Sequence, residues 1–172
     1  YQIVSRLDML LFMPILGIAI SLTTIVGMFF GAKEYKKLLS VVNYGINRAV
    51  IITIISVIIF FVLAENILPI FSSNTHVVDI GVTYLKIIIL GYPAVGISVI
   101  CSRVCQALGQ GVPLLITTIT RVIILTAPLS YYFYFIGKPL EWVWFSQVFA
   151  ILIAAIISYA WMRFYFKKFN IV

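Results

Sequence analysis

Five long apolar segments divide the chain, and each is long enough to cross a lipid bilayer. A membrane-spanning helix needs about 20 mostly apolar residues. The segments cover residues 9–30, 46–71, 79–108, 113–136 and 139–166. Their apolar runs do not alternate with polar residues, as the strands of a membrane barrel must. The sequence therefore predicts an all-α fold, a polytopic bundle of five transmembrane helices.

Composition excludes the main soluble classes. Hydrophobic residues make up 63% of the 172 residues and charged residues 10%, whereas soluble domains have about 45–50% and about 25%. So few charged side chains cannot cover a water-soluble globule of this size. Soluble enzymes, nucleic-acid-binding proteins and disordered tails are excluded, and we expect an integral membrane protein surrounded by lipid.

The basic residues gather in every second connection, which predicts the orientation in the membrane. They are Lys33, Lys36, Lys37 and Arg48 around the first connection, Arg103 at the end of the third segment, and Arg163, Lys167 and Lys168 after the fifth. Positive charge favours the cytoplasmic side, so the C-terminus is expected in the cytoplasm. Five crossings then put Tyr1 outside, and we expect at least one further helix upstream of it.

Residues 32–46 have a different pattern from the five segments. Tyr35, Leu38 and Val42 fall on one helical face, and Lys33 and Lys36 fall on another. Such a pattern is typical of an amphipathic helix that lies in the membrane interface. We therefore expect a separate interfacial helix over residues 32–46.

The segments lack the side chains that catalysis, metal binding or ion coupling needs. Cys101 and Cys105 share a helical face with no other Cys or His nearby, and His76 lies in a polar connection. The apolar core of each segment is free of Asp and Glu. We therefore expect no enzyme, no metal and no cofactor, and any carboxylate that couples transport to an ion is expected upstream of Tyr1.

Stripes of small and weakly polar residues follow the first and third segments, next to prolines. We take them as candidate pathway residues: Met13, Pro14, Gly17, Ser21, Thr24, Tyr92, Pro93, Ser98 and Ser102. Two interpretations stay open for them, close helix packing and the lining of a cavity beside bendable helices. Arg121 is a deep charge in the fourth segment, and it either binds an anion, contacts helix carbonyls or reaches to the membrane surface.

Several short motifs occur in a familiar order. They are Val26-Gly-Met-Phe-Phe-Gly-Ala-Lys33, Ile70-Phe71, Tyr84-Leu85, Leu90-Gly-Tyr-Pro93, Gln106-Ala-Leu-Gly109, Pro113, Arg121, Ala127-Pro-Leu129 and Val143-Trp144. Their order and spacing resemble the C-terminal lobe of the multidrug and toxic compound extrusion (MATE) family of transporters, in the MOP superfamily. The resemblance covers essentially the whole chain.

The resemblance implies two six-helix lobes, of which residues 1–172 are helices eight to twelve of the C-terminal one, with an N-terminal lobe upstream. It implies export of cationic amphipathic drugs across the cell membrane, in exchange for protons or sodium ions. Met13, Gly17, Ser21, Tyr92 and Ser98 would face the drug. The family often has Gln-Asn where Met28 and Phe29 follow Gly27 here, and some branches carry acids in these helices, so coupling is expected in the N-terminal lobe.

Two other functions remain as alternatives. A flippase of the same superfamily that moves a lipid-linked oligosaccharide needs cationic side chains for the pyrophosphate, and Arg121 is the deep candidate. A non-transporting membrane scaffold subunit predicts a packed interior with no hydrated cleft.

Overall fold

The computed structural model describes residues 2–71 and 75–171, and the regular structure within these ranges is helical. The elements in order are α1 (Gln2–Gly31), α2 (Tyr35–Phe71), α3 (Thr75–Ile88), a 3₁₀ turn η1 (Ile89–Gly91), α4 (Tyr92–Ala107), α5 (Val112–Ile119), a π-helical segment η2 (Thr120–Thr126), α6 (Ala127–Phe135) and α7 (Leu140–Lys168).

Five stretches of helix are long and apolar enough to cross a membrane: Leu7–Gly31, Tyr35–Pro69, Thr75–Ala107, Val112–Phe135 and Leu140–Lys168. This confirms the predicted all-α class with five spanning helices. The third stretch joins α3, η1 and α4, and the fourth joins α5, η2 and α6. Each of these two spans therefore changes its helical winding inside the membrane.

Two helices begin earlier than the sequence predicted. Helix α1 begins at Gln2 instead of residue 9, so Asp8 lies inside the helix. The segment expected as a separate interfacial helix forms the first turns of α2 from Tyr35 onwards, without a break before the span. Its apolar face is covered by protein, because Leu38 and Val42 are fully buried in the core.

Two prolines explain the changes in winding. Proline lacks a backbone N–H and its ring clashes with the carbonyl four residues earlier. Before Pro93, the N–H of Tyr92 donates to the carbonyl of Ile89, three residues back. Before Pro128, the N–H of Ala127 donates to the carbonyl of Val122, five residues back. Pi-helical turns are rare and frequently lie at functional sites, so η2 marks a place to look for one.

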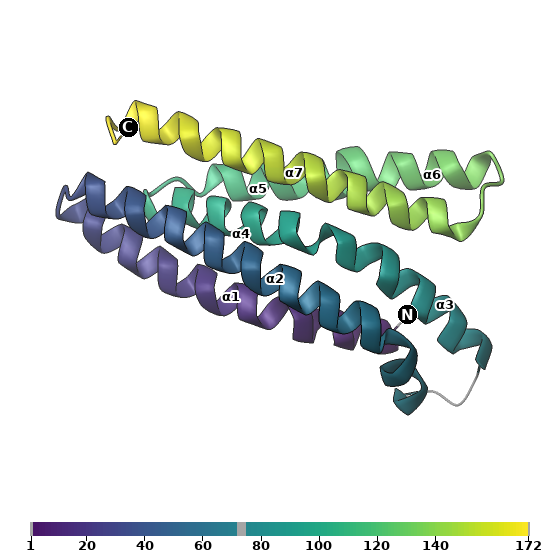
Figure 1. Cartoon of the computed structure of the whole chain (residues 1–172). Coiled ribbons are helices and arrows are strands. Elements are labelled where there is room, and N and C mark those ends of the chain that lie inside the picture. The colour runs from purple at the N-terminus through teal and green to yellow at the C-terminus, as the bar shows by residue number, and fades with distance from the viewer. Residues whose placement is uncertain (1, 72–74, 172) are drawn as a thin grey trace.

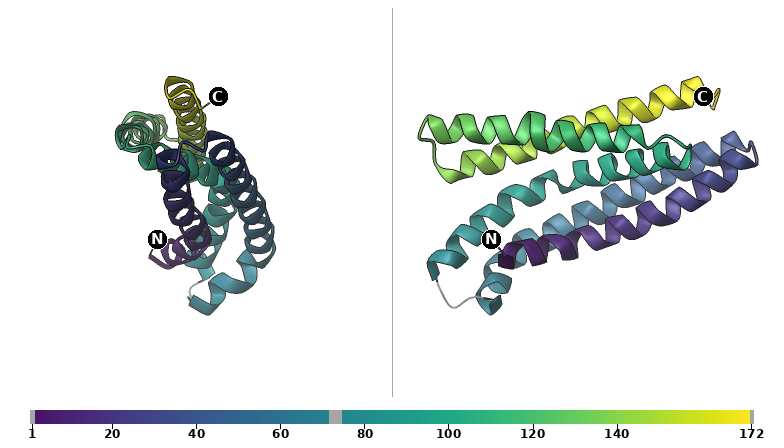
Figure 2. Two further views of the ribbon diagram at one scale, coloured as in Figure 1. Left: turned by 90° about the vertical axis from the view of Figure 1, so that its left-hand side faces the viewer. Right: turned by 180° about the vertical axis from the view of Figure 1, so that it is seen from behind.

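The α3–α4 span lies between two groups of helices. Helices α1 and α2 run side by side on one of its flanks, and α5, α6 and α7 lie on the other (Figures 1 and 2). Buried residues make up 61% of the most apolar stretch of the α3–α4 span, against 39% or less in each other span. The central span therefore supplies contacts to both groups, and sites between the groups form along it.

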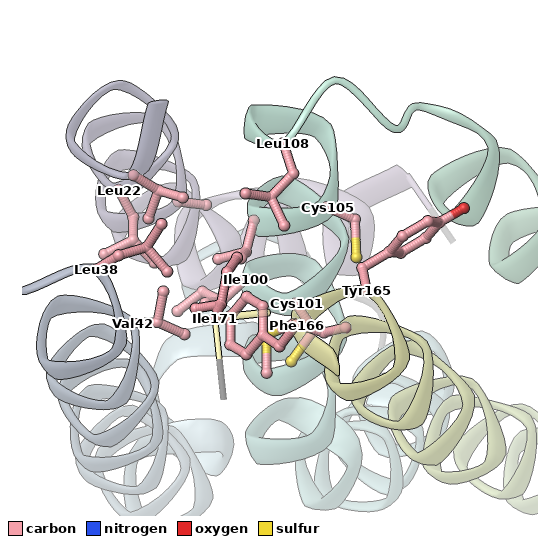
Figure 3. Packing of buried hydrophobic residues seen from close by; sticks show 14 of the residues in the cluster. Leu22, Leu38, Val42, Ile100, Cys101, Cys105, Leu108, Tyr165, Phe166 and Ile171 are labelled. Carbon is pink, nitrogen blue, oxygen red and sulfur yellow. The ribbon is translucent and has the colours of Figure 1, made fainter. Parts of the chain in front are cut away.

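The largest apolar core lies where α1, α2, α4 and α7 meet (Figure 3). It contains Leu38, Ile100 and Phe166, which are nearly or fully inaccessible to solvent. Cys101 and Cys105 are part of this core as free thiols. Both cysteines are therefore packing residues on one helical face.

The two ends of the bundle differ in charge. The α1–α2 turn, the α4–α5 connection and the C-terminus lie at one end (Figure 1), where the ring centroid of Phe30 is 5.4 Å from that of Phe169. This end carries the basic residues Lys33, Lys36, Lys37, Arg163, Lys167 and Lys168. The α6–α7 turn lies at the opposite end. We refer to these as the basic end and the opposite end.

Candidate functional site

A cavity of about 550 Å³ lies between α1, the α3–α4 span, η2 and α7. Its polar lining residues are Asp8, Tyr92, Arg121, Thr126 and Gln147, and its apolar ones include Met9 and Phe12. We call it the Asp8 cavity. Drug-sized ligands are held in cavities of roughly 300–1,000 Å³ that combine apolar walls with a few polar groups, and this cavity has both.

Asp8 and Tyr92 join the first and third spans across this cavity. The hydroxyl of Tyr92 donates to the Asp8 carboxylate and lies 3.1 Å from the Asp8 carbonyl oxygen. Tyr92 is the first residue of α4 after the 3₁₀ turn and is 5% exposed. Since Tyr92 lies near the middle of the span Thr75–Ala107, the contact places the carboxyl group of Asp8 well inside the bundle.

The structure adds one feature that the sequence did not reveal. Asp8 is the second residue of the span Leu7–Gly31, at the edge of the apolar core that we expected to be free of Asp and Glu. The apolar run counted from Met9 excluded Asp8, because hydropathy treats a charge as the edge of a span. Hydrogen bonding by Tyr92, which the sequence does not reveal, satisfies this carboxylate inside the helix bundle.

Arg121 lies in the π-helical segment η2, well inside the fourth span. The Thr126 hydroxyl donates to the Arg121 carbonyl, five residues back, at 2.8 Å. The Arg121 side chain is partly exposed. Among the described residues its guanidinium has no hydrogen-bond or ion-pair partner, and it lines the same cavity as Asp8.

A second, smaller cavity of about 230 Å³ adjoins the first on the side of the basic end. Its polar lining residues are Ser98, Ser102, Arg103, Thr117, Thr118 and Arg121. We call it the arginine cavity. Arg121 and Phe12 line both cavities, so the two cavities lie next to each other along α4.

The candidate pathway residues divide into two groups. Tyr92, Ser98, Ser102 and Arg121 line the two cavities, and Pro93 is half-buried beside Tyr92. The stripe on α1 is exposed instead, and it comprises Met13, Pro14, Gly17, Ser21 and Thr24. On α1 the cavities are lined by Met9 and by three residues with a four-residue spacing, Asp8, Phe12 and Leu16. This spacing is visible in the sequence, but two of the three residues are apolar and carry no signal of a site.

Ser98 and Ser102 also take part in packing. The Oγ atoms of Ser98 and Ser158 are 3.0 Å apart, and the Ser102 hydroxyl donates to Ser158 at 3.4 Å. These contacts tie α4 to α7 at the edge of the arginine cavity. The two interpretations of the stripe on α4, packing and cavity lining, therefore apply to the same side chains.

Replacing Ser158 with Ala should loosen this junction. The change removes the partner of two hydroxyls, and an interhelical hydrogen bond in a membrane contributes roughly 0.6–1.7 kcal/mol. We expect a loss of that order in the free energy of unfolding, measured by thermal unfolding in detergent. Ser40→Ala, at an exposed position on α2, is the matched control and should leave the unfolding temperature unchanged. Equal effects of both variants would show that the hydroxyl contacts contribute nothing.

Comparison with known proteins identifies the family. The MatE family model matches residues 1–132, most of the chain. The chain belongs to the MatE family. It is 28% identical over 131 residues to the probable multidrug resistance protein NorM of Thermotoga maritima, an alignment that covers 76% of this chain and 28% of that relative. The resemblance inferred from the sequence motifs is thereby confirmed.

Solved structures of the MatE family share the fold. A MATE protein in its straight conformation superposes with a TM-score of 0.92 at 24% identity, over 100% of this chain and 39% of the other. An inward-facing multidrug resistance MATE family transporter of the MOP superfamily gives a TM-score of 0.88 at 24% identity, over 97% and 39%. The five helices therefore have the arrangement found in one part of MatE family proteins.

The chain spans 28% of the length of the curated MatE relative that it matches. The relatives named above are transport or drug-resistance proteins by their descriptions, which agrees with the expectation that the chain is not an enzyme. The five helices that are long and apolar enough to cross a membrane fit a multi-pass membrane protein, as expected for a member of this family.

Proposed function

We propose that the chain forms one lobe of a secondary active exporter that moves cationic amphipathic compounds out of the cell in exchange for protons or sodium ions. The lobe works together with an N-terminal lobe, and substrate passes between the two. Family membership supports transport. The Asp8 cavity supports the class of substrate.

The composition of the Asp8 cavity carries this proposal. It places a carboxylate beside the rings of Phe12 and Tyr92 and the thioether of Met9. A carboxylate attracts an organic cation, aromatic faces add cation–π attraction, and Met adapts its shape to varied apolar groups. Arg121 lines the same cavity, but within the described residues it forms no ion pair with Asp8, so a bound cation does not have to break a salt bridge.

Transport in this proposal uses the break in the central span. The 3₁₀ turn at η1 lets α3 and α4 change their angle beside Pro93, while the lobe moves against its partner. The coupling ion is a proton or a sodium ion, and its site is placed in the part of the MatE relatives that this chain does not cover. A scaffold subunit, the alternative without transport, predicted a packed interior, and both cavities weigh against it.

Replacing Tyr92 with Ala should weaken export of aromatic cations. The change removes both the aromatic wall and the hydroxyl that holds Asp8 in place. We expect about a five- to tenfold fall in dye efflux from cells, in line with the loss of one cation–π contact and one charge-assisted hydrogen bond. Tyr92→Phe keeps the ring and should lose less. Tyr159→Ala, on an exposed face of α7, serves as control, and unchanged efflux by Tyr92→Ala would count against the proposal.

The cell membrane is the proposed location, with the basic end in the cytoplasm. Single cysteines at Lys36 and Lys138 report on the two ends of the bundle, because the native Cys101 and Cys105 are buried. A membrane-impermeant maleimide should label Lys138→Cys in intact cells, and Lys36→Cys only after the cells are permeabilised. The reverse pattern would contradict this orientation.

A further inference from the structure

The arginine cavity carries an inference that is independent of the proposed export of cations. We infer that it binds a phosphate group, with Arg103 and Arg121 as the residues that hold it. The two guanidinium groups come from α4 and η2 and line one cavity of about 230 Å³. Among the described residues that line this cavity there is no Asp or Glu, so its charge is positive.

Neither arginine is neutralised within the described part of the chain. Arg103 donates to the side-chain oxygen of Gln106 at 3.1 Å, which is a neutral acceptor. Arg121 has no hydrogen-bond or ion-pair partner there. A guanidinium carries five N–H donors. Most of the donors on these two side chains are therefore available to a ligand.

The hydroxyl groups around the arginines are already engaged. Thr117 and Thr118 donate to α5 carbonyls at 2.7 and 2.8 Å, and Ser98 and Ser102 contact Ser158. They make the wall polar without taking up the positive charge. The binding energy for a ligand in this cavity therefore comes from the two guanidinium groups.

Phosphate fits this arrangement for three reasons. A positive charge inside a membrane protein is costly unless an anion or a water-filled space receives it. The planar guanidinium fork matches the oxygens of a phosphate in a bidentate contact. The cavity is also far larger than the roughly 10–15 Å³ that one water requires, so it admits a phosphate with its hydration. Basic pockets between helices near the cytoplasmic side bind lipid phosphates in this way.

A lipid headgroup and a soluble phosphate share this chemistry, and the experiment separates them. The purified protein in detergent is titrated with phosphatidylglycerol and phosphatidylcholine by native mass spectrometry, and separately with glycerol 3-phosphate in a thermal-shift assay. The test variant is Arg103→Gln with Arg121→Gln. The control is Arg163→Gln with Lys167→Gln, which removes the same charge at exposed positions near the basic end.

We expect the double Arg103/Arg121 variant to bind at least one phosphate probe about tenfold more weakly or worse, since each charge-assisted contact is lost. The control pair should stay within about twofold of the parent. Loss of phosphatidylglycerol binding alone identifies a lipid headgroup, and loss of glycerol 3-phosphate stabilisation identifies a soluble phosphate. If both probes bind the test variant as well as the parent, or the control loses as much, the inference is overturned.

Replacing both arginines with Lys provides a second test should the Gln variant not fold. Lysine keeps the charge but lacks the planar fork. Phosphate affinity should then fall by a smaller factor than in the Gln variant but by more than in the control pair. Parent-like affinity of the Lys variant would show that charge alone, without the bidentate geometry, explains any binding.

Discussion

Cells that produce the Asp8→Asn variant should lose most of their export of cationic compounds. Asparagine keeps the size and the oxygen acceptor that the Tyr92 hydroxyl uses, so the α1–α4 contact and the fold should persist. The negative charge that faces the Asp8 cavity is lost. Interactions of charged groups contribute roughly 1.5–3 kcal/mol, which corresponds to about a ten- to hundredfold fall in efflux.

The control for this variant is Asp79→Asn, the same chemical change at an exposed position in α3. It should leave efflux unchanged. Neutral substrates, if any are exported, should be affected much less by Asp8→Asn than cationic ones. If cells produce the Asp8→Asn variant in the same amount as the parent protein and keep full resistance to cationic drugs, the Asp8 cavity is not part of the export pathway.

The Gly45→Val variant should be strongly destabilised, because Gly45 of α2 packs tightly against the Leu22 side chain of α1. A Cβ atom placed at Gly45 lies 2.7 Å from a terminal methyl carbon of Leu22. Leu22 is itself buried, with 5% of its surface exposed, so it has little space to move. Overpacking of this kind costs about 1–3 kcal/mol, and thermal unfolding in detergent measures it.

Gly17→Val is the matched control, since no atom lies within 4 Å of a Cβ at Gly17. Both variants carry the same change in helix propensity, so their difference isolates the contact with Leu22. Adding Leu22→Ala to Gly45→Val should recover part of the stability by making room. Equal unfolding temperatures for Gly45→Val and Gly17→Val would contradict the close approach of α1 and α2.

The number of spans, their helical nature and the family could be predicted from the sequence. Long apolar runs dictate the spans, because every backbone polar group in lipid must be paired within the segment. Pro93 also indicated a change in the third helix, and the 3₁₀ turn occurs there. These features depend on local sequence, which explains why they were predictable.

Features that depend on contacts between helices were missed. Residues from Tyr35 to Ile46 have an amphipathic pattern that suits either a membrane interface or a helix packed on protein, and only the burial of Leu38 and Val42 decides between the two. Asp8 marked the beginning of the first span, and its contact with Tyr92 could not be predicted because the two residues are 84 positions apart. Arg103 lies near the end of α4, as the sequence indicated, but the cavity that it lines forms only when α4 packs beside α5 and η2.

The short 3₁₀ turn before Pro93 allows α3 to tilt as a rigid helix relative to α4. Helix α3 has 14 residues and is therefore about 21 Å long, so a tilt of roughly 10° at η1 displaces its far end by roughly 4 Å. Tyr92 lies next to η1, the pivot of this tilt, so the same tilt hardly displaces Tyr92 itself. A contact can therefore persist between Tyr92 and Asp8 while the outer mouth of the bundle, near Thr75, widens or narrows.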